Sequence, residues 1–147
     1  MIAVRVQTEA FDLAAETRAL SEGRTDIGAV ASFVGFVRGG EVEALTLEHY
    51  PAMTAKALEA IAAEAASRWP LLGGTVIHRH GRLLPGDAIG LVAVAAAHRG
   101  DAFAACEFVM DYLKTAAPFW KKEETSGESR WVEAKSEDAA ARERWRR

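Results

Sequence analysis

The stretch that decides the fold is AIGLVAVAAA at residues 88–97, followed directly by HRGDAFAACEFVMDYLKTAA at residues 98–117. The first part is an uncharged apolar run, which is typical of a strand covered on both faces. The second part carries an apolar residue at every third or fourth position, which predicts an amphipathic helix that ends before Pro118. The residues of this stripe are Phe103, Cys106, Met110, Leu113 and Ala117. We therefore expect a central strand followed by a helix that covers it.

Further strand and helix signals lie on both sides of this unit. Strands are expected at residues 2–6, 27–37, 42–50, 75–80, 119–123 and 130–135, and helices at 11–22 and 53–69, with a loose helix at 136–147. The first residues of the helix at 53–69, including Met53, belong to its apolar stripe. Hairpins outnumber crossover connections in this order, which favours an α+β fold, a largely antiparallel sheet with two main helices, over a parallel nucleotide-binding fold.

Length and composition restrict the class of protein. The chain has 147 residues, of which 50% are hydrophobic and 27% charged, so a single domain spanning residues 1–147 is expected. The net charge of −3 argues against a nucleic-acid binder, which would carry a basic excess. The N-terminus does not resemble a signal peptide, and no apolar run reaches the length of a membrane span. Together with the single cysteine, Cys106, this predicts a cytoplasmic location without disulfides.

Several common site motifs are absent from the sequence. Neither a dinucleotide-binding glycine pattern nor a phosphate-binding loop is present, and no serine lies in a nucleophile elbow. A metal-dependent phosphohydrolase that uses His49, His78, His80 and His98 stays open as an alternative. These histidines have no cysteine or carboxylate partners at ligand spacing, so we expect no metal and no cofactor.

Cationic residues mark a candidate site instead. His98 and Arg99 follow the central strand directly, and Lys114 lies in the last turn of the expected helix. Lys121 follows on the next strand, so chain reversal at Pro118 could bring the two lysines together. Arg38 precedes Gly39 and Gly40 in an expected hairpin loop, where its guanidinium could bind a phosphate. Spacing alone leaves the alternatives open: a strand cap, a helix-dipole partner or a solvated surface explains each residue equally well.

Taken together, six segments resemble one known family. They are GFVR at 35–38, LTLEHYPAM at 45–53, HRHG at 78–81, AHR at 97–99, DYLKTAAPFWKKE at 111–123 and RWVEAK at 130–135. These segments, in this order, resemble the large, catalytic subunit of molybdopterin synthase over roughly residues 27–135. The sequence departs from the family pattern in a short loop after Arg38, in AHR where SAHR is more usual, and in His80 where an apolar residue is usual.

The resemblance implies an activity, partners and a fold. The family converts cyclic pyranopterin monophosphate, precursor Z, into molybdopterin by installing the two sulfurs of a dithiolene, without a metal. Sulfur arrives as a C-terminal Gly-Gly thiocarboxylate on a small ubiquitin-like partner subunit. The large subunits form a homodimer with one small subunit at each end, a heterotetramer. The fold implied is an α/β hammerhead with a small C-terminal β subdomain.

The resemblance also implies roles for individual residues. Lys114 and Lys121 match the catalytic positions, beside the thiocarboxylate and the pterin respectively. Arg38, His98 and Arg99 match positions that bind the substrate, with His98 and Arg99 reaching across the homodimer interface. Lys135, where the family often has arginine, is a further substrate-binding candidate.

One alternative comes from a different class of protein. Trp120 and Trp131, beside basic residues in the expected C-terminal strands, are typical of an interface. The chain could therefore be a non-catalytic module that docks a ubiquitin-like protein without turning over a substrate.

Overall fold

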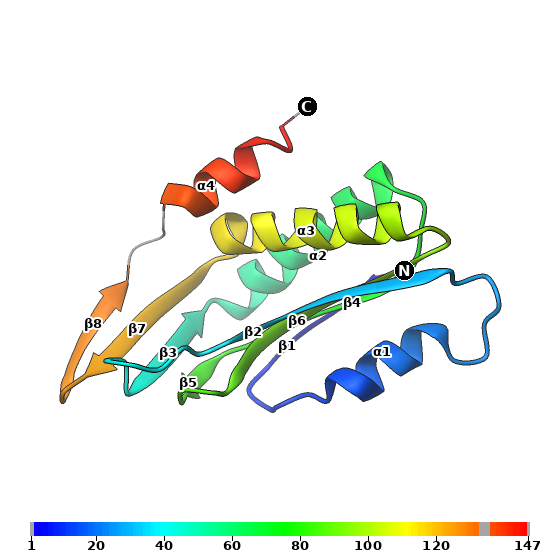
Figure 1. Ribbon diagram of the computed structural model, residues 1–147. Helices are drawn as coiled ribbons and strands as arrows, with labels where there is room; N and C mark the ends of the chain where they lie inside the picture. Colours follow the sequence, from blue (N-terminus) through cyan, green and yellow to red (C-terminus); the bar gives the residue numbers. More distant parts are fainter. Residues whose placement is uncertain (1, 133–135, 147) are drawn as a thin grey trace.

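The computed structural model describes residues 2–132 and 136–146, which form eight strands and four helices (Figure 1). The strands are β1 (Ile2–Gln7), β2 (Ala29–Phe36), β3 (Ala44–His49), β4 (Leu71–Arg79), β5 (Gly81–Leu83), β6 (Ala88–Ala96), β7 (Phe119–Thr125) and β8 (Glu128–Val132). The helices are α1 (Leu13–Ser21), α2 (Pro51–Arg68), α3 (Arg99–Ala116) and α4 (Ser136–Glu143). The expected α+β class is confirmed, and the expected elements are present with shifted bounds. No described helix combines the length and apolarity needed to span a bilayer.

The larger sheet has the strand order β1-β4-β6-β2, with β6 in the interior as the apolar run predicts. Residues 91–96 of β6 are all buried because helices cover both faces of the strand. The pairs β4-β6 and β2-β6 are antiparallel, and β1 pairs with β4 in parallel. The sheet is thus largely antiparallel, as expected.

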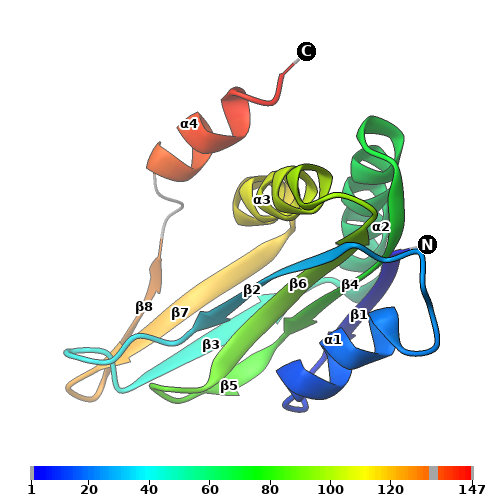
Figure 2. The ribbon, with the colours of Figure 1, turned by 45° about the vertical axis from the view of Figure 1, so that its right-hand side comes forward.

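Helices α2 and α3 cover one face of this sheet, and α1 lies on the opposite face (Figures 1 and 2). The main core lies under α2 and α3 and includes Phe108, Val76 and Val92. A smaller cluster around Ile77 and Leu91 packs against residues of the α1 side. Alternation along β4 and β6 therefore assigns even-numbered residues of these strands to the α3 side and odd-numbered ones to the α1 side.

A second sheet, of order β5-β3-β7-β8, forms the small β subdomain. The two strands expected near the C-terminus form a hairpin in it, β7 with β8, and β3 and β5 from the middle of the chain complete the sheet. The expected hairpin between residues 27–37 and 42–50 is wrong, because β2 and β3 belong to different sheets. The sequence analysis also missed β5, which has only three residues and follows β4 almost directly.

Two predicted core residues lie at the surface instead. Phe103 of α3 is 66% exposed, while Ala102, Ala105 and Val109 are buried. Met53 of α2 is also exposed, and Thr54 takes the buried position. Phe103 and Met53 are each the first residue of the predicted apolar stripe. Stripe residues follow them on one side only, so the spacing determines the face of the helix on which they lie less well than for residues farther along. The rest of each predicted stripe is mostly buried or packs against the core, including Leu58 and Ile61 in α2 and Cys106 in α3, so only the first position of each stripe was wrong.

Helix α4 packs on the outer side of α3 (Figure 1). Just beyond it, Trp145 contacts Trp69 and Phe108 edge to face and donates a hydrogen bond from Nε1 to Asp111. The backbone carbonyl of Trp145 also accepts a hydrogen bond from Arg68. The C-terminal segment therefore packs against both α2 and α3 and is hydrogen-bonded to them.

Candidate active site

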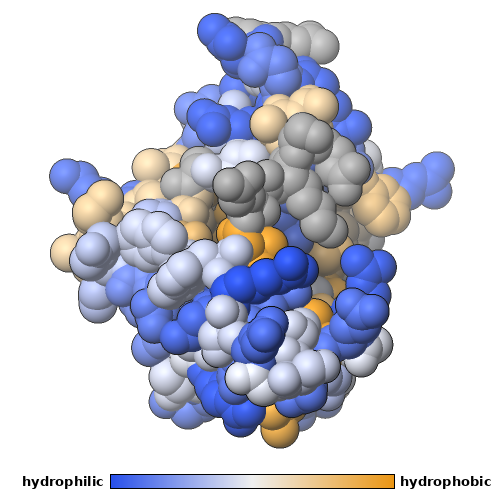
Figure 3. Space-filling model, turned by 90° about the vertical axis from the view of Figure 1, so that its left-hand side faces the viewer, coloured by the Kyte–Doolittle hydropathy of each residue, from blue (hydrophilic) through white to orange (hydrophobic). Residues whose placement is uncertain are grey.

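A cavity of about 100 Å³ lies between the large sheet, the C-terminal end of α3 and strand β7. Lys114 and Lys121 both line this cavity, Lys114 from the last turn of α3 and Lys121 from β7. The structure therefore confirms that chain reversal at Pro118 brings the two lysines to one site. The remaining walls are mostly apolar, from Leu47, Met110, Leu113 and Phe119 among others. On this side of the molecule, apolar residues are visible in a hollow above a band of hydrophilic residues (Figure 3).

A row of three residues forms the floor of the cavity on the sheet. Gly90 of β6 is paired with His78 of β4 on one side and with Gly35 of β2 on the other. All three line the cavity. A methyl group at Gly90 would approach the carbonyl oxygen of Ile77 to 2.7 Å, so this position requires glycine in the present backbone. Two glycines in register leave the sheet surface bare beside His78, and this creates the space that the lysines border.

His78 is held in one orientation and one tautomer. Its Nδ1 lies 2.8 Å from the backbone oxygen of Arg79, which can only accept, so Nδ1 carries the hydrogen and Nε2 is the acceptor nitrogen. The ring stacks on Phe119 with 3.7 Å between the ring centroids and 14° between the planes. Burial lowers the pKa of His78 to about 4, and the positive charges of Lys121 and Lys114 act in the same direction. The imidazole is therefore neutral at neutral pH.

Two further histidines lie next to this group. His49 contacts the His80 ring at 4.4 Å and shares a hydrogen bond of 3.1 Å with Thr54, and burial lowers the pKa of His49. His98, the fourth member of the metal-site alternative, precedes α3 at the far end of β6. Within residues 2–132 and 136–146, no group of three or more potential ligands is placed to hold a metal ion. The structure thus separates His98 from the other three histidines that this alternative requires.

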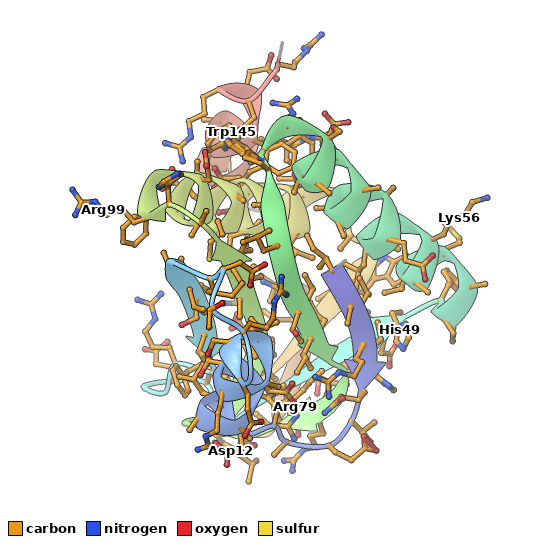
Figure 4. All side chains as sticks on the ribbon, turned by 90° about the vertical axis from the view of Figure 1, so that its right-hand side faces the viewer. Asp12, His49, Lys56, Arg79, Arg99 and Trp145 are labelled. Carbon is orange, nitrogen blue, oxygen red and sulfur yellow. The ribbon has the colours of Figure 1, made fainter. Side chains whose placement is uncertain are left out.

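His98 and Arg99 lie far from the lysines of the same chain. Arg99 begins α3 and Lys114 lies in its last turn, so a rise of about 1.5 Å per residue puts them roughly 20 Å apart. Both residues are exposed, and Arg99 extends away from the body of the molecule (Figure 4). His98 is the N-cap residue but makes no side-chain capping bond, which leaves the first N–H groups of α3 available to an anion.

The other two predicted residues are placed differently. Arg38 is exposed and follows Val37, which is buried and bonded through its backbone to Gly86 and Asp87. Arg38 is not among the described residues that line the cavity. Lys135 lies outside the described residues.

Some residues of the site were not predicted. His78 was considered only as a metal ligand, and the contributions of Phe119, Gly35 and Gly90 were missed. The alternation from Val76 to His78 was a usable signal, because it puts His78 on the face that the helix covers. The pairing of Gly35 with Gly90 depends on the register between β2 and β6, which one sequence does not specify.

Comparison with known proteins shows the family of the chain. Residues 6–116 match the family described as MoaE protein. Proteins named molybdopterin synthase catalytic subunit from Ralstonia nicotianae and Pseudomonas aeruginosa are each 57% identical, covering 99% and 98% of this chain and 85% and 99% of their own.

Solved structures give the same result. A molybdopterin cofactor biosynthesis protein E from Burkholderia multivorans is 61% identical, with a TM-score of 0.85, covering 99% of this chain and 97% of that one. The molybdopterin synthase from Staphylococcus aureus is 32% identical, with a TM-score of 0.79, covering 87% and 95%. The family match spans most of the chain and these relatives align over nearly their whole length, so the chain belongs to the MoaE family of molybdopterin synthase catalytic subunits.

Proposed function

We propose that this chain is the catalytic subunit of a molybdopterin synthase. It transfers sulfur to cyclic pyranopterin monophosphate, precursor Z, and so forms the dithiolene of molybdopterin. The observation that carries the proposal is that Lys114 and Lys121 line one cavity in a member of this family. The sulfur donor is the C-terminal Gly-Gly thiocarboxylate of a small ubiquitin-like partner.

The two lysines have roles that follow from their charge and surroundings. A thiocarboxylate and a phosphorylated pterin are both anions, and ammonium groups bind anions most strongly where apolar walls exclude water. Lys114, in the last turn of α3, is assigned to the thiocarboxylate, and Lys121, on β7, to the pterin. A cavity of about 100 Å³ suits an extended chain end without side chains, such as Gly-Gly.

The N-terminal end of α3 is assigned to the phosphate of the substrate. Its unbonded N–H groups attract anions, and Arg99 and His98 add side-chain donors at the same place. Arg38 and Lys135 are assigned as additional cations of the substrate site. This phosphate site is too far from the lysines of its own chain to serve the same substrate.

A homodimer resolves this separation. Strand β2 is an edge strand, with a described neighbour on one side only, and Phe33 and Phe103 are exposed beside it at 42% and 66%. The first residue of β2 pairs with Ala96, near His98, and Gly35 near the other end borders the cavity. A two-fold axis across β2 reverses the strand, so it brings the partner subunit's Arg99 toward the cavity of the first subunit. One small subunit on each large subunit completes a heterotetramer.

Surface aromatics of the second sheet are assigned to the small partner. Trp120 packs edge to face on Tyr50, and Lys122 lies over the ring of Trp131, all on or beside β7 and β8. We place the assembly in the cytoplasm, where the thiol of Cys106 stays reduced. Residues 1–147 are taken as a single domain.

The experiment that tests the proposal is a reconstitution. The purified chain is mixed with precursor Z and a small carrier that ends in a Gly-Gly thiocarboxylate, and molybdopterin is measured. Product is expected with this carrier and none with the same carrier ending in a carboxylate. If the carrier binds but no product forms, the docking-module alternative is correct.

A further inference from the structure

The proposed sulfur transfer requires a step that the two lysines do not supply. When the thiocarboxylate sulfur attacks a substrate carbon, the carrier becomes joined to the substrate through a thioester. Release of the carrier then needs a water molecule, whose oxygen bonds to the acyl carbon while the carbon–sulfur bond breaks. This water needs a group that accepts its proton. A protonated lysine has no free lone pair and cannot be that group.

The cavity contains one group that can accept this proton. Apart from Lys114 and Lys121, the described residues that line it are apolar or glycine, with the exception of His78. The hydrogen bond from Nδ1 to the Arg79 oxygen fixes the tautomer in which Nε2 has the free lone pair. Stacking on Phe119 holds the ring plane at the cavity wall. Gly90 and Gly35, in the same cross-strand row, leave room for a chain end and a water molecule beside the ring.

The electrostatic setting of His78 changes in the direction that this step needs. In the free protein, burial and the charges of Lys121 and Lys114 keep the ring neutral, so Nε2 is ready to accept a proton. The thioester itself is uncharged, but attack by water puts a negative charge on the acyl oxygen, beside the lysines. This charge offsets theirs, so the basicity of the imidazole increases as the water gives up its proton.

We propose that His78 is the proton acceptor for hydrolysis of the carrier–substrate thioester, an inference that rests on the proposed function. Water attacks the acyl carbon and gives one proton to Nε2 of His78. The sulfur leaves with the bonding electron pair as a thiolate on the substrate, and the carrier leaves as a carboxylic acid that ionises to carboxylate. His78 then returns its proton to the thiolate, so no oxidant or reductant is consumed.

The test compares His78→Asn with wild type in the full chain, using thiocarboxylated carrier and precursor Z. Asparagine keeps an N–H group where Nδ1 donates to Arg79 but has no basic nitrogen. We expect product formation to fall by about 100-fold. We also expect a covalent carrier–substrate adduct to accumulate in intact-mass spectra, and hydroxylamine to cleave it to the carrier hydroxamate, as a thioester requires. His80→Asn is the matched control, because His80 does not line the cavity, and it should show the wild-type rate without adduct.

The outcomes separate this inference from the proposed function. If His78→Asn turns over at the wild-type rate, or is slow without any adduct, His78 is not the acceptor. If wild type itself forms no product, the proposed function fails first. Circular dichroism and the thermal midpoint check folding, and His78→Gln replaces the asparagine variant if that variant does not fold.

Discussion

The two ends of α3 both carry cationic residues, but their surroundings differ. At the C-terminal end, Lys114 lines a cavity together with Lys121, and a neutral histidine and apolar walls complete it. At the N-terminal end, His98 and Arg99 are exposed, with no side-chain cap on the helix. The first site is formed within one chain, whereas the second becomes a binding site only when another surface faces it. This difference is the basis for the proposal that a complete active site needs two copies of the chain.

The largest effect is expected at the cavity end. Lys121→Ala removes an ammonium group from a cavity whose other walls are mostly apolar, so sulfur transfer should fall by roughly 100- to 1,000-fold. Molybdopterin formation under single-turnover conditions measures this. Lys56→Ala, at an exposed position of α2 that points away from the molecule (Figure 4), is the matched control and should keep most of the activity. Equal losses in both variants would show that the loss of charge, and not its place in the cavity, lowers the rate.

A smaller effect is expected at the exposed end. Arg99→Ala should lower kcat/KM by roughly 10- to 100-fold, through loss of charged hydrogen bonds to the substrate phosphate. Mixing inactive Lys114→Ala with Arg99→Ala subunits tests whether the site is shared. A shared site predicts recovery to about a quarter of the wild-type rate, because half of the dimers are mixed and each has one intact site. No recovery after subunit exchange would mean that Arg99 acts within its own chain or not at all.

The smallest effect concerns stability and pH. The pKa of His78 lies near 4 in the folded chain, below its ordinary value of 6.5, because burial disfavours the charged ring. Between these values the unfolded chain binds more protons, so this contribution is present above pH 6.5 and is lost as the pH falls toward 4. Urea denaturation should show a loss in the free energy of unfolding of roughly 3 kcal/mol over this window that His78→Asn lacks. His98→Asn, which leaves His78 in place, is the control and should keep the loss of unfolding free energy that wild type shows as the pH falls.

Much of the fold could be predicted from local patterns. The apolar run at residues 88–97 predicts β6 as an interior strand, and Pro118 predicts where α3 ends. Phe103 and Met53 were misplaced because a stripe of alanines fixes the phase of a helix weakly. The pairing of β3 with β7 was not predictable, because it joins segments far apart in the chain whose register no local signal specifies.

The site was predictable to a similar degree. Spacing suggested that Lys114 and Lys121 approach each other, and the resemblance to the family identified them as functional. The role of His78 depends on the cross-strand row with Gly90 and Gly35 and on stacking with Phe119, which are properties of the folded chain. The distance of Arg99 from the lysines is also a property of the fold. Arg99 and Lys114 are close in the sequence, but they lie at opposite ends of α3.

The measurement that tests the central claim most directly is molybdopterin formation by Lys114→Ala beside Lys56→Ala, each with thiocarboxylated carrier and precursor Z. Lys56 is exposed on α2 and points away from the molecule (Figure 4), so its variant serves as a matched loss of charge. The account predicts a loss of at least about 100-fold for Lys114→Ala, with stability within about 0.5 kcal/mol of wild type, and normal turnover for Lys56→Ala. Near-normal turnover by a folded Lys114→Ala variant would contradict it.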